Sequence, residues 1–502
     1  MGNREHIFKE EGHLFPGKTY AEAVLAPAFD QAKKELLPAM MAIHKAHLIM
    51  LQEQALIAEA DVHQIASALQ QLDVEKFRKA EYTGRFEDLF FQVEHELLEL
   101  AGDVAGNLHI ARSRNDMGIA IYRMVLREKL LTVIESALSL QRSLIEVAGE
   151  NKETLMIGYT HTQQAQPTTL AHYLVAVIDV LGRDIHRLEA AYANNNRSPM
   201  GAAALTTSGF NISRERVREL LAFDALVENA YDAVAGVDYA SEAAAAVQLA
   251  AIHLGRFTQE LLLWCTQEFD AIRVANPYVQ VSSIMPQKRN PVSIEHARSL
   301  LSSVVGNAQT VLTMIHNTPF GDIVDTEDDM QPYLWKSIET LDHVYRLLAV
   351  VIGTLKINKD KLRRRTEASF AVVTELADTL VRSEGYSFRT AHHVVGSVVS
   401  AAQAQGLAAS EIPLALVAEA AGAISGKALR LQESELRRAL DPEQFVRIRK
   451  HPGGPDPDET RRALREREAL HAQHARWAEQ AGEAVRAKLT ALDTYIAQRS
   501  QQ

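Results

Sequence analysis

Apolar residues recur with helical spacing along most of the chain and predict several long helices. From Gly118 to Gly149 no proline or glycine interrupts the pattern. Its apolar seam repeats every seven residues, at Met124, Leu131, Leu138 and Ile145. A helix of this length, about 45 Å at 1.5 Å per residue, cannot bury its seam inside one small domain. The pattern therefore predicts a bundle of long helices that forms between subunits.

Further helical patterns fill most of the remaining chain, and we find neither an internal repeat nor a strand pattern worth predicting. The main predicted helices cover residues 60–72, 87–100, 167–191, 211–223, 229–270, 291–316 and 330–355, with shorter ones from 358 to 441. We predict an all-α protein in three domains with a charged helix at the end: an N-terminal helical domain (1–112), a central long-helix bundle with the polar loops (113–357), a C-terminal helical domain (358–455) and the charged helix (456–502). Because this last helix carries few large apolar residues, we expect it to be solvated or loosely docked.

Composition agrees with a helical protein and excludes several classes of partner. The chain has 502 residues, of which 47% are hydrophobic and only 6% aromatic, and its net charge of −11 comes from interleaved acids and bases. No polybasic surface predicts binding of nucleic acid or of a membrane. Cys265 is the only cysteine and lies in an apolar run, so neither an intrachain disulfide nor a cysteine-rich metal site is expected. The N-terminal residues lack the apolar core of a secretion signal, and we expect a cytoplasmic protein.

Three polar stretches interrupt the helical pattern, and each precedes a predicted helix. The first, Val281 to Glu295, reads Val-Ser-Ser-Ile-Met-Pro-Gln-Lys-Arg-Asn-Pro-Val-Ser-Ile-Glu. A loop that enters a helix N-terminus directs backbone N–H groups and partial positive charge outward, which suits a carboxylate or an anionic intermediate. Lys288 adds a full charge and Asn290 an uncharged donor. We interpret this stretch as a site for an anion rather than as a polar surface turn.

The second stretch, His109 to Asp116, places two arginines around a serine, with Asn115 next. Guanidinium forks and amide donors hold carboxylates in both position and orientation. Asp116 is also well placed to cap the helix that follows, although capping alone leaves the other polar residues unexplained.

The third stretch, residues 158–167, reads Gly-Tyr-Thr-His-Thr-Gln-Gln-Ala-Gln-Pro. His161 is the titratable group there that is suited to proton transfer near neutral pH. We predict a short loop that leads through Pro167 into a helix. Long antiparallel helices could hold the three stretches at different ends of one chain, in which case the site must be built from several subunits.

The first stretch resembles the fingerprint Gly-Ser-Ser-x-Met-Pro-x-Lys-x-Asn of the fumarase/aspartase superfamily, whose members eliminate a group from a succinyl unit and release fumarate. Val281 stands in place of the glycine. Because valine tolerates positive φ poorly, either the backbone at the loop entry differs or the need for glycine is not absolute. The resemblance implies a homotetramer whose central helices form one bundle, with each active site drawn from three chains.

The other stretches resemble those of argininosuccinate lyase more narrowly. The matching motifs are Ala-Arg-Ser-Arg-Asn-Asp, Gly-Tyr-Thr-His-x-Gln-x-Ala-Gln-Pro, Asn229 with Asp232-Ala-Val, Leu376-Ala-Asp-x-Leu-Val-Arg, Ala391-His-His-x-Val-Gly396 and Gly453-Gly. The resemblance extends from about Ala46 to Pro455. It implies a place in amino-acid metabolism and, for argininosuccinate itself, in arginine biosynthesis.

The resemblance also implies roles for individual residues. Ser282 is the base that removes a proton from the carbon beside a carboxylate, and His161, paired with Glu295, is the other member of the acid/base machinery. Lys288 and Asn290 steady the doubly negative intermediate. The remaining substrate-binding residues are Ser113, Arg114, Asn115, Thr160, Gln163, Ser283 and Met285.

The chemistry explains why these residue types are needed. A proton on a carbon beside a carboxylate is a very weak acid, so donors must stabilise the charge that accumulates on that carboxylate, and losing one such donor costs about 3 to 4 kcal/mol. Serine is a poor base at neutral pH, so the loop amides and Lys288 must lower its pKa. No metal or organic cofactor is signalled.

Several positions depart from the pattern of argininosuccinate lyases. Phe90 replaces a histidine, Gln92 an asparagine, Val292 an aspartate, and Asp322, Glu327 and Met330 replace a tyrosine, a glutamine and a lysine. The last three changes alter the local charge by about three units, which disfavours a second carboxylate and favours a cationic or neutral leaving group. The sequence Arg289-Asn-Pro-Val resembles adenylosuccinate lyase and carboxymuconate cycloisomerase more closely.

We therefore predict an argininosuccinate lyase-like carbon–nitrogen lyase that eliminates an amine or guanidine from an N-substituted aspartate, argininosuccinate or an analogue, through an aci-carboxylate intermediate. Two alternatives stay open: another reaction of the superfamily, such as an ammonia-lyase or adenylosuccinate lyase-like reaction, and a structural oligomer that has lost activity. The intact set of chemical residues argues against the last alternative: Ser282, His161, Lys288, Asn290 and Glu295.

Overall fold

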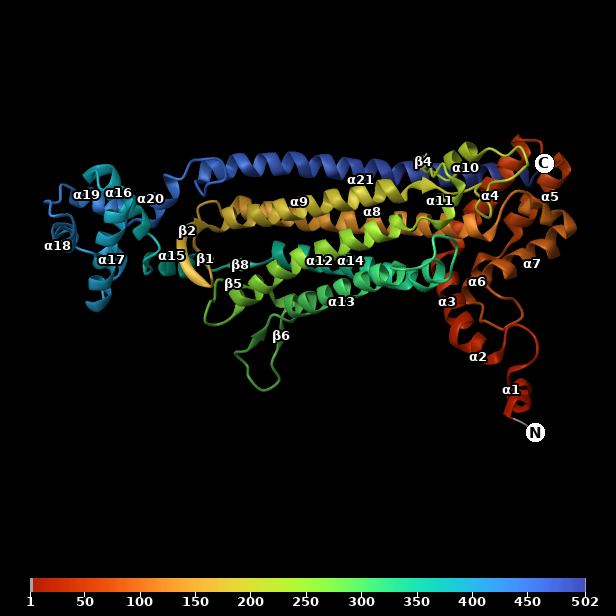
Figure 1. The fold of residues 1–502 in the computed structure, drawn as a ribbon, viewed down its shortest axis with the longest axis horizontal. Coiled ribbons are helices and arrows are strands. Elements are labelled where there is room, and N and C mark those ends of the chain that lie inside the picture. The colour runs from red at the N-terminus through yellow and green to blue at the C-terminus, as the bar shows by residue number, and fades with distance from the viewer. Residues whose placement is uncertain (1–2, 502) are drawn as a thin grey trace.

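Five long helices form the central bundle in the computed structural model, which describes residues 3–501 (Figure 1). They are α8 (Arg114–Glu150), α9 (Leu170–Asn195), α12 (Asp238–Cys265), α13 (Val292–Ile315) and α14 (Gln331–Gly353). The helix α8 packs against α9 and α14, and α13 packs against α12 and α14. The prediction of an all-α protein built on a bundle of long helices is confirmed.

The start of α8 is fixed by a capping box. The N-cap residue is Ser113, whose hydroxyl oxygen accepts from the Asn115 amide at 3.3 Å, while Asp116 accepts from the Ser113 amide at 3.0 Å. Asp116 thus caps the helix from its first turn, as expected from the sequence, while Ser113 is the N-cap residue. Its second oxygen accepts from the amides of Gly201 and Ala203, at 2.8 and 3.0 Å. This buried carboxylate therefore ties the loop before α8 to a loop far along the chain.

The interior of α8 carries the predicted apolar seam, together with a fully buried arginine. All four seam residues are buried: Met124, Leu131, Leu138 and Ile145. Arg127 has no exposed surface, and its Nη1 donates to Asn196 Oδ1 at 3.1 Å and to the carbonyls of Leu221 and Ala222 at 2.9 and 3.1 Å. The guanidinium thereby supplies a charged donor to acceptors of two loops, including the Leu221 carbonyl.

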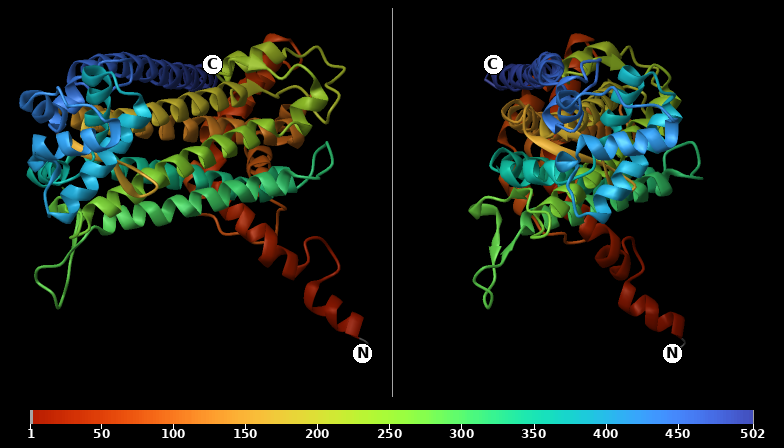
Figure 2. Two further views of the ribbon diagram at one scale, coloured as in Figure 1. Left: turned by 60° about the vertical axis from the view of Figure 1, so that its left-hand side comes forward. Right: turned by 90° about the vertical axis from the view of Figure 1, so that its left-hand side faces the viewer.

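The N-terminal helices gather at one end of the bundle, and α1 and α2 extend away from it (Figures 1 and 2). These elements are α1 (Asn3–Glu11), α2 (Lys18–Tyr20), the π-helical turn η1 (Ala21–Leu25), α3 (Ala26–Glu35), α4 (Leu37–Glu53), α5 (Glu59–Gln71), α6 (Val74–Lys79), α7 (Leu89–Ala101) and the 3₁₀ segment η2 (Gly102–His109). The buried apolar residues of α4, α5 and α7 join the core of the central bundle.

A second hydrophobic core forms at the opposite end of the molecule (Figure 1). It is built from α16 (Val373–Glu384), α17 (Phe388–Ala404), η5 (Ala409–Glu411), α18 (Leu414–Ser425), α19 (Glu433–Ala439) and α20 (Pro442–Arg447), while α15 (Lys359–Glu367) precedes them. Leu376, Leu436 and Phe445 are among its fully buried side chains. The chain then returns along the bundle.

This return is α21 (Pro457–Arg499), which packs on α8, α9 and α5. Arg467 pairs with Asp179 at 2.7 Å and His474 with Glu189 at 2.7 Å, while Leu492 and Ile496 are buried. The expectation of a solvated or loosely docked helix is therefore wrong. Charged side chains of α21 form ion pairs with α9, and these pairs let the helix dock although it has few large apolar residues.

The remaining elements are short and shape the loops. The strands pair two by two: β1 (Leu155–Thr160) with β2 (Gln163–Thr169), β3 (Arg197–Ser198) with β4 (Ala225–Leu226), β5 (Ile272–Arg273) with β8 (Lys356–Ile357), and β6 (Gln280–Val281) with β7 (Arg289–Asn290). The other short helices are α10 (Arg214–Leu220), α11 (Ala230–Ala235), η3 (Asn276–Tyr278) and the π-helical turn η4 (Asp325–Asp329). The run predicted as one helix from 229 to 270 is broken at Gly236, where a Cβ would lie 2.6 Å from Asp232 Oδ1.

Replacing the buried arginine should destabilise the fold. We expect Arg127→Met to lower the free energy of unfolding by about 3 kcal/mol, because three buried acceptors lose a charged donor. Urea unfolding followed by circular dichroism measures the change. As a matched control, the exposed Arg142 of the same helix should tolerate the change to Met with a loss below about 1 kcal/mol. Equal losses at both positions would contradict the assigned role of Arg127.

Candidate active site

The histidine stretch forms a β-hairpin, not the short loop predicted from sequence. In it Tyr159 pairs with Gln164 and Thr160 with Gln163, which leaves His161 and Thr162 at the turn with φ of 51° and 62°. Two successive residues with positive φ form the turn that matches the twist of a tight hairpin, although a β-branched threonine is strained there. The tip of the hairpin, residues 160–163, is exposed. Pro167 lies within β2, and Thr169 instead caps α9, accepting from the His172 amide at 3.1 Å.

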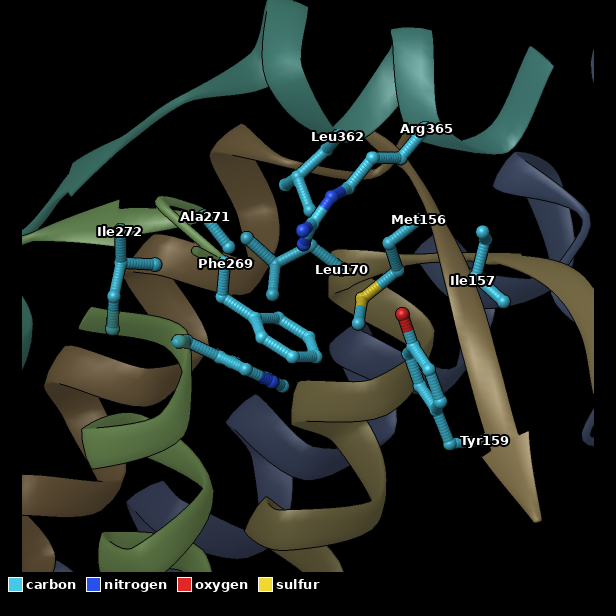
Figure 3. A pocket seen from close by; sticks show the side chains of 10 residues that line it. Met156, Ile157, Tyr159, Leu170, Phe269, Ala271, Ile272, Leu362 and Arg365 are labelled. Carbon is cyan, nitrogen blue, oxygen red and sulfur yellow. The ribbon is translucent and has the colours of Figure 1, made fainter. Parts of the chain in front are cut away.

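Packing anchors the base of the hairpin while its tip projects. The base borders a small apolar cavity of about 20 Å³. Figure 3 shows Arg365 reaching over this cavity from α15. The Arg365 guanidinium lies 4.6 Å from the centre of the Phe269 ring and donates to the carbonyl of Glu268 at 2.6 Å. The Phe269 ring in turn lies 6.0 Å from that of Tyr159 on β1. In the first turn of α9, which follows the hairpin, His172 Nε2 contacts the Gly453 carbonyl at 2.9 Å.

The fingerprint loop, residues 282–290, projects from the bundle between β6 and β7 (Figure 2). The Ser282 hydroxyl oxygen accepts from the backbone amides of Ile284 and Met285, at 3.3 and 3.0 Å. These two hydrogen bonds fix the position of the Ser282 side chain within the turn. Val281 lies in strand β6, so the loop entry has an extended backbone and needs no glycine.

The flanks of the fingerprint loop are held more firmly than its centre. Arg289 Nη2 donates to the Val274 carbonyl at 3.1 Å, and Ser293 Oγ donates to the Tyr278 carbonyl at 2.9 Å. The helix α13 begins at Val292 after Pro291 and carries Glu295 on its first turn. The side chains of Ser283, Met285, Lys288 and Glu295 are exposed, and those of Ser282 and Asn290 are partly buried. The loop thus presents its polar groups outward from one chain.

The arginine stretch lies at the N-terminus of α8 beside acidic residues. Arg114 pairs with Asp88 at 2.6 Å and with Glu87 at 3.5 Å, and its guanidinium lies 4.8 Å from the centre of the Phe91 ring. Ser113 Oγ donates to Asn115 Oδ1 at 2.5 Å. The side chains of this predicted substrate-binding group are therefore held in place before any substrate arrives.

Asn115 also reaches the acidic loop, residues 322–329, by donating from Nδ2 to Asp322. Burial, reinforced by the neighbouring carboxyl of Asp322, raises the pKa of Glu327 to about 8. Tyr122 donates to Asp328 at 2.6 Å, and burial raises the pKa of this tyrosine well above its ordinary value. The N-terminus of α8 is thus surrounded by carboxyl groups.

The structure does not bring the three predicted groups together within one chain. The N-terminus of α8 lies at one end of the bundle, whereas the hairpin follows the C-terminus of the same helix (Figure 1). A helix of 37 residues is about 55 Å long. Within residues 3–501, no hydrogen bond or ion pair joins the groups around Ser113, His161 and Ser282, and the predicted pairing of His161 with Glu295 is not made inside the chain. The sequence reasoning anticipated this separation.

Sequence reasoning did not assign to the site several residues that contact it. Asp88, Glu87 and Asp322 hold the side chains of Arg114 and Asn115, and the amides of Ile284 and Met285 hold Ser282. Asp322 was marked only as a departure from the family pattern. The concentration of acids between 322 and 329 is the signal that points to this segment.

Two general properties of the described residues complete the picture. Within residues 3–501, no three histidine, cysteine or acidic side chains are arranged to hold a metal ion. Over the same range, every helix is too short or too polar to cross a bilayer.

Comparisons with known proteins agree with this architecture. A family model described as lyase matches residues 21–306, and one described as argininosuccinate lyase C-terminal matches residues 370–447. The chain is 42% identical over 456 residues to argininosuccinate lyase 2 of Agrobacterium fabrum (strain C58), with 90% of each chain covered. It is 37% identical to the argininosuccinate lyase of Methanocaldococcus jannaschii, covering 86% of this chain and 88% of that one.

Solved structures extend the comparison to the whole fold. A crystal structure of EDDS lyase in complex with formate superposes with a TM-score of 0.87 at 31% identity, covering 99% of this chain and 98% of that one. The class II fumarase of Schistosoma mansoni shares the fold, with a TM-score of 0.66 at 16% identity over 82% and 90% of the two chains.

The long-helix bundle and its polar end loops thus define a lyase of the fumarase/aspartase superfamily. Within it, the chain belongs to the argininosuccinate lyase family, and it is a carbon–nitrogen lyase. The predictions of fold, family and enzyme class are confirmed.

The raised pKa of Glu327 should make stability depend on pH. Its ordinary value is 4.5 and its folded value about 8, so between these values the folded chain keeps a proton that the unfolded chain releases. The free energy of unfolding therefore falls as pH rises through this range. We expect the melting temperature of Glu327→Gln to exceed that of the parent increasingly from pH 5 to pH 8.

Thermal unfolding at a series of pH values measures this difference. Glu419→Gln, which removes an exposed carboxylate from α18, serves as the control and should follow the parent at each pH. Parallel curves for Glu327→Gln and the parent would contradict a protonated Glu327 in the fold.

Proposed function

We propose that this lyase eliminates an amine or guanidine from an N-substituted aspartate, argininosuccinate or a close analogue, and releases fumarate. The observation that carries the proposal is the pair of backbone amides directed at the Ser282 hydroxyl oxygen. A serine in such a turn is prepared to act as a base, and the surrounding residues match the fingerprint of a superfamily that uses it. The argininosuccinate lyases that the chain resembles support the substrate class.

In the proposed mechanism Ser282 removes a proton from the carbon beside one carboxylate of the aspartate unit. The electron pair moves onto that carboxylate, giving a doubly negative intermediate, which Lys288 and Asn290 stabilise by charge and by hydrogen bonding. The bond between the adjacent carbon and nitrogen then breaks. The leaving nitrogen receives a proton from the acid of the site, assigned to His161 with Glu295. Fumarate and a free amine or guanidine result, so that atoms and charges balance.

The remaining predicted residues bind and orient the substrate. Arg114 and Asn115 present a guanidinium and an amide to a carboxylate, and Ser113 holds the Asn115 side chain. Thr160 and Gln163 flank His161, whereas Ser283 and Met285 belong to the fingerprint loop. The exposure of the last four in a single chain supports a role in contacts made with other chains.

We further propose that the enzyme is a homotetramer in the cytoplasm, with each site drawn from three chains. A helix about 55 Å long separates Ser113 from His161, so one chain does not bring them to one substrate. The outward faces of the bundle support assembly, since they expose large apolar side chains: Leu249, Ile252, Leu263, Leu300 and Val350. A groove of about 1030 Å³ between α9 and α12 offers room for helices of another copy.

The proposed base gives the most direct test. We expect the purified protein to release fumarate from argininosuccinate or another N-substituted aspartate, and Ser282→Ala to lower kcat by about three orders of magnitude. Fumarate is measured by its ultraviolet absorbance across a panel of such substrates. Gln287→Ala changes an exposed residue of the same loop and should retain activity. Fumarate release by Ser282→Ala at the parent rate would refute the serine base.

If each active site is shared between chains, two inactive variants should complement each other when they are mixed. Asn115→Ala and Ser282→Ala are each expected to be inactive, but mixed tetramers formed by unfolding and refolding them together should recover about a quarter of the parent activity. Random mixing pairs an intact Asn115 with an intact Ser282 in that fraction of sites. Ser282→Ala mixed with Lys288→Ala should recover nothing, because both residues lie on the loop of one chain. Equal recovery, or none, in the two mixtures would contradict sites shared in this way.

A further inference from the structure

Two buried histidines of α4 hold the turn that leads into α8. His47 Nε2 donates to the Ile110 carbonyl at 2.9 Å, and Arg112 Nη1 donates to His44 Nδ1 at 3.1 Å. Between these two contacts Ala111 has a φ of 57°, a left-handed conformation that an alanine seldom adopts. The turn directly before α8 is therefore strained, and contacts from α4 on both sides of the strained residue stabilise it.

The pair of His44 and Arg112 joins a neutral imidazole to a charged guanidinium. Burial, together with the positive charge of Arg112, lowers the pKa of His44 well below its ordinary value, whereas burial lowers the pKa of Arg112 only to about 10. At neutral pH the histidine is therefore neutral and the arginine charged. Because a guanidinium only donates, the ring of His44 accepts at Nδ1 and carries its proton on Nε2.

The same pair is costly to bury. His44 is 1% exposed and Arg112 8%. Three of their nitrogen donors, His44 Nε2 and Arg112 Nε and Nη2, are buried and lack an acceptor among residues 3–501. Buried donors without acceptors lower stability. The pair is therefore better explained by the position that it gives to the guanidinium than by a contribution to stability.

Phe90 packs between this pair and Arg114. Its ring centre lies 6.1 Å from that of His44 at an interplanar angle of 20°, and the Arg114 guanidinium lies 6.0 Å from the same ring centre. Phe90 stands where argininosuccinate lyases carry a histidine. An apolar ring at this position offers no competing hydrogen bond, so His44 Nδ1 is left to accept from Arg112.

The helix α4 is itself held by the end of α21. Lys45 pairs with Asp493 at 2.6 Å, and the Tyr495 hydroxyl donates to Gln52 Oε1 at 3.1 Å. Most residues of α4 between 39 and 51 are buried. The histidines of α4 therefore act from a firmly packed helix on the turn before α8.

We propose that His44 is a positioning residue of the lyase: by accepting a hydrogen bond from Arg112, it fixes the turn that presents residues 113–115 to a substrate carboxylate. The inference rests on the proposed function, in which those three residues bind the substrate. His44 does not touch the substrate, since its side chain is buried. Its loss should therefore weaken substrate binding, whereas the chemical step, carried by the fingerprint loop, should change little.

Asparagine and glutamine at position 44 test this role, because they place the same amide group at two distances from the backbone. The side-chain oxygen of asparagine takes about the position of Nδ1, whereas that of glutamine reaches about the position of Nε2. We expect His44→Gln to raise KM by about tenfold, a free-energy difference of about 1.4 kcal/mol. Its kcat should stay within about threefold of the parent value, and His44→Asn should restore KM to within about threefold. The assay is fumarate release from argininosuccinate, or from whichever N-substituted aspartate the parent cleaves fastest.

His471 of α21 offers a matched control, because it is another buried histidine beside an arginine. It is 6% exposed, and its Nε2 lies 3.2 Å from Arg142 Nη2. His471→Asn and His471→Gln should leave KM unchanged, even where they lower the melting temperature.

Arg112→Lys tests the same contact from its other side, since it keeps the charge but loses the planar guanidinium. It should raise KM as His44→Gln does, and it decides the question if His44→Gln does not fold. The double variant should raise KM no further than the stronger single variant, because both changes break one contact. Melting temperatures establish which variants are folded.

The outcomes separate this inference from the proposed function. If the parent releases fumarate and folded His44→Gln has the KM of the parent, the inference is overturned and the proposed function stands. Equal values of KM for His44→Asn and His44→Gln, an equal rise for His471→Gln, or single effects that multiply in the double variant also overturn it. Absence of fumarate from the parent with every N-substituted aspartate overturns the proposed function, and this inference with it.

Discussion

The length of α8 sets the distance between the arginine stretch at its start and the histidine hairpin after its end, and the organisation of the candidate site depends on that distance. The helix holds Ser113 to Asn115 at its start and places the hairpin with His161 a few residues beyond its end, about 55 Å away at 1.5 Å per residue. Packing on both sides keeps it straight, since its apolar seam is buried against α9 and α14. No movement of loops in one chain spans such a distance, so the chemistry encoded in these motifs requires contact between chains.

The hairpin and the fingerprint loop are each anchored at the base and exposed at the tip. The hairpin is anchored where Arg365 covers Phe269, while its tip carries positive φ at His161 and Thr162. The fingerprint loop is anchored on both flanks by hydrogen bonds from Arg289 and Ser293. The interactions that fix geometry thus lie within the chain, whereas the reactive side chains point outward. This is the arrangement expected when a site becomes complete only at an interface.

Much of the fold follows from sequence, but the contacts between distant residues do not. Uninterrupted helical spacing predicted α8 nearly to its ends, and the alanine-rich run predicted the helix α12. The hairpin at residues 158–167 escaped prediction because its strands lack apolar alternation and its turn contains neither glycine nor asparagine at the positive-φ positions. The docking of α21 escaped because it depends on pairs such as Arg467 with Asp179, nearly 300 residues apart along the chain.

For the candidate site too, local motifs could be predicted from the sequence, whereas contacts between distant residues could not. Motif matching identified candidate residues, because each motif is local, but Asp322, which accepts from Asn115, lies 207 positions further along the chain. Proximity also changes their chemistry, since burial beside Asp322 raises the pKa of Glu327 to about 8. A carboxyl group with this pKa is mostly neutral near physiological pH, so it can donate as well as accept a hydrogen bond, and unlike a glutamine it becomes an anion when the pH rises further. The charge at this end of α8 therefore depends on a proton that the fold itself holds on Glu327, and the local sequence of either segment does not reveal that proton.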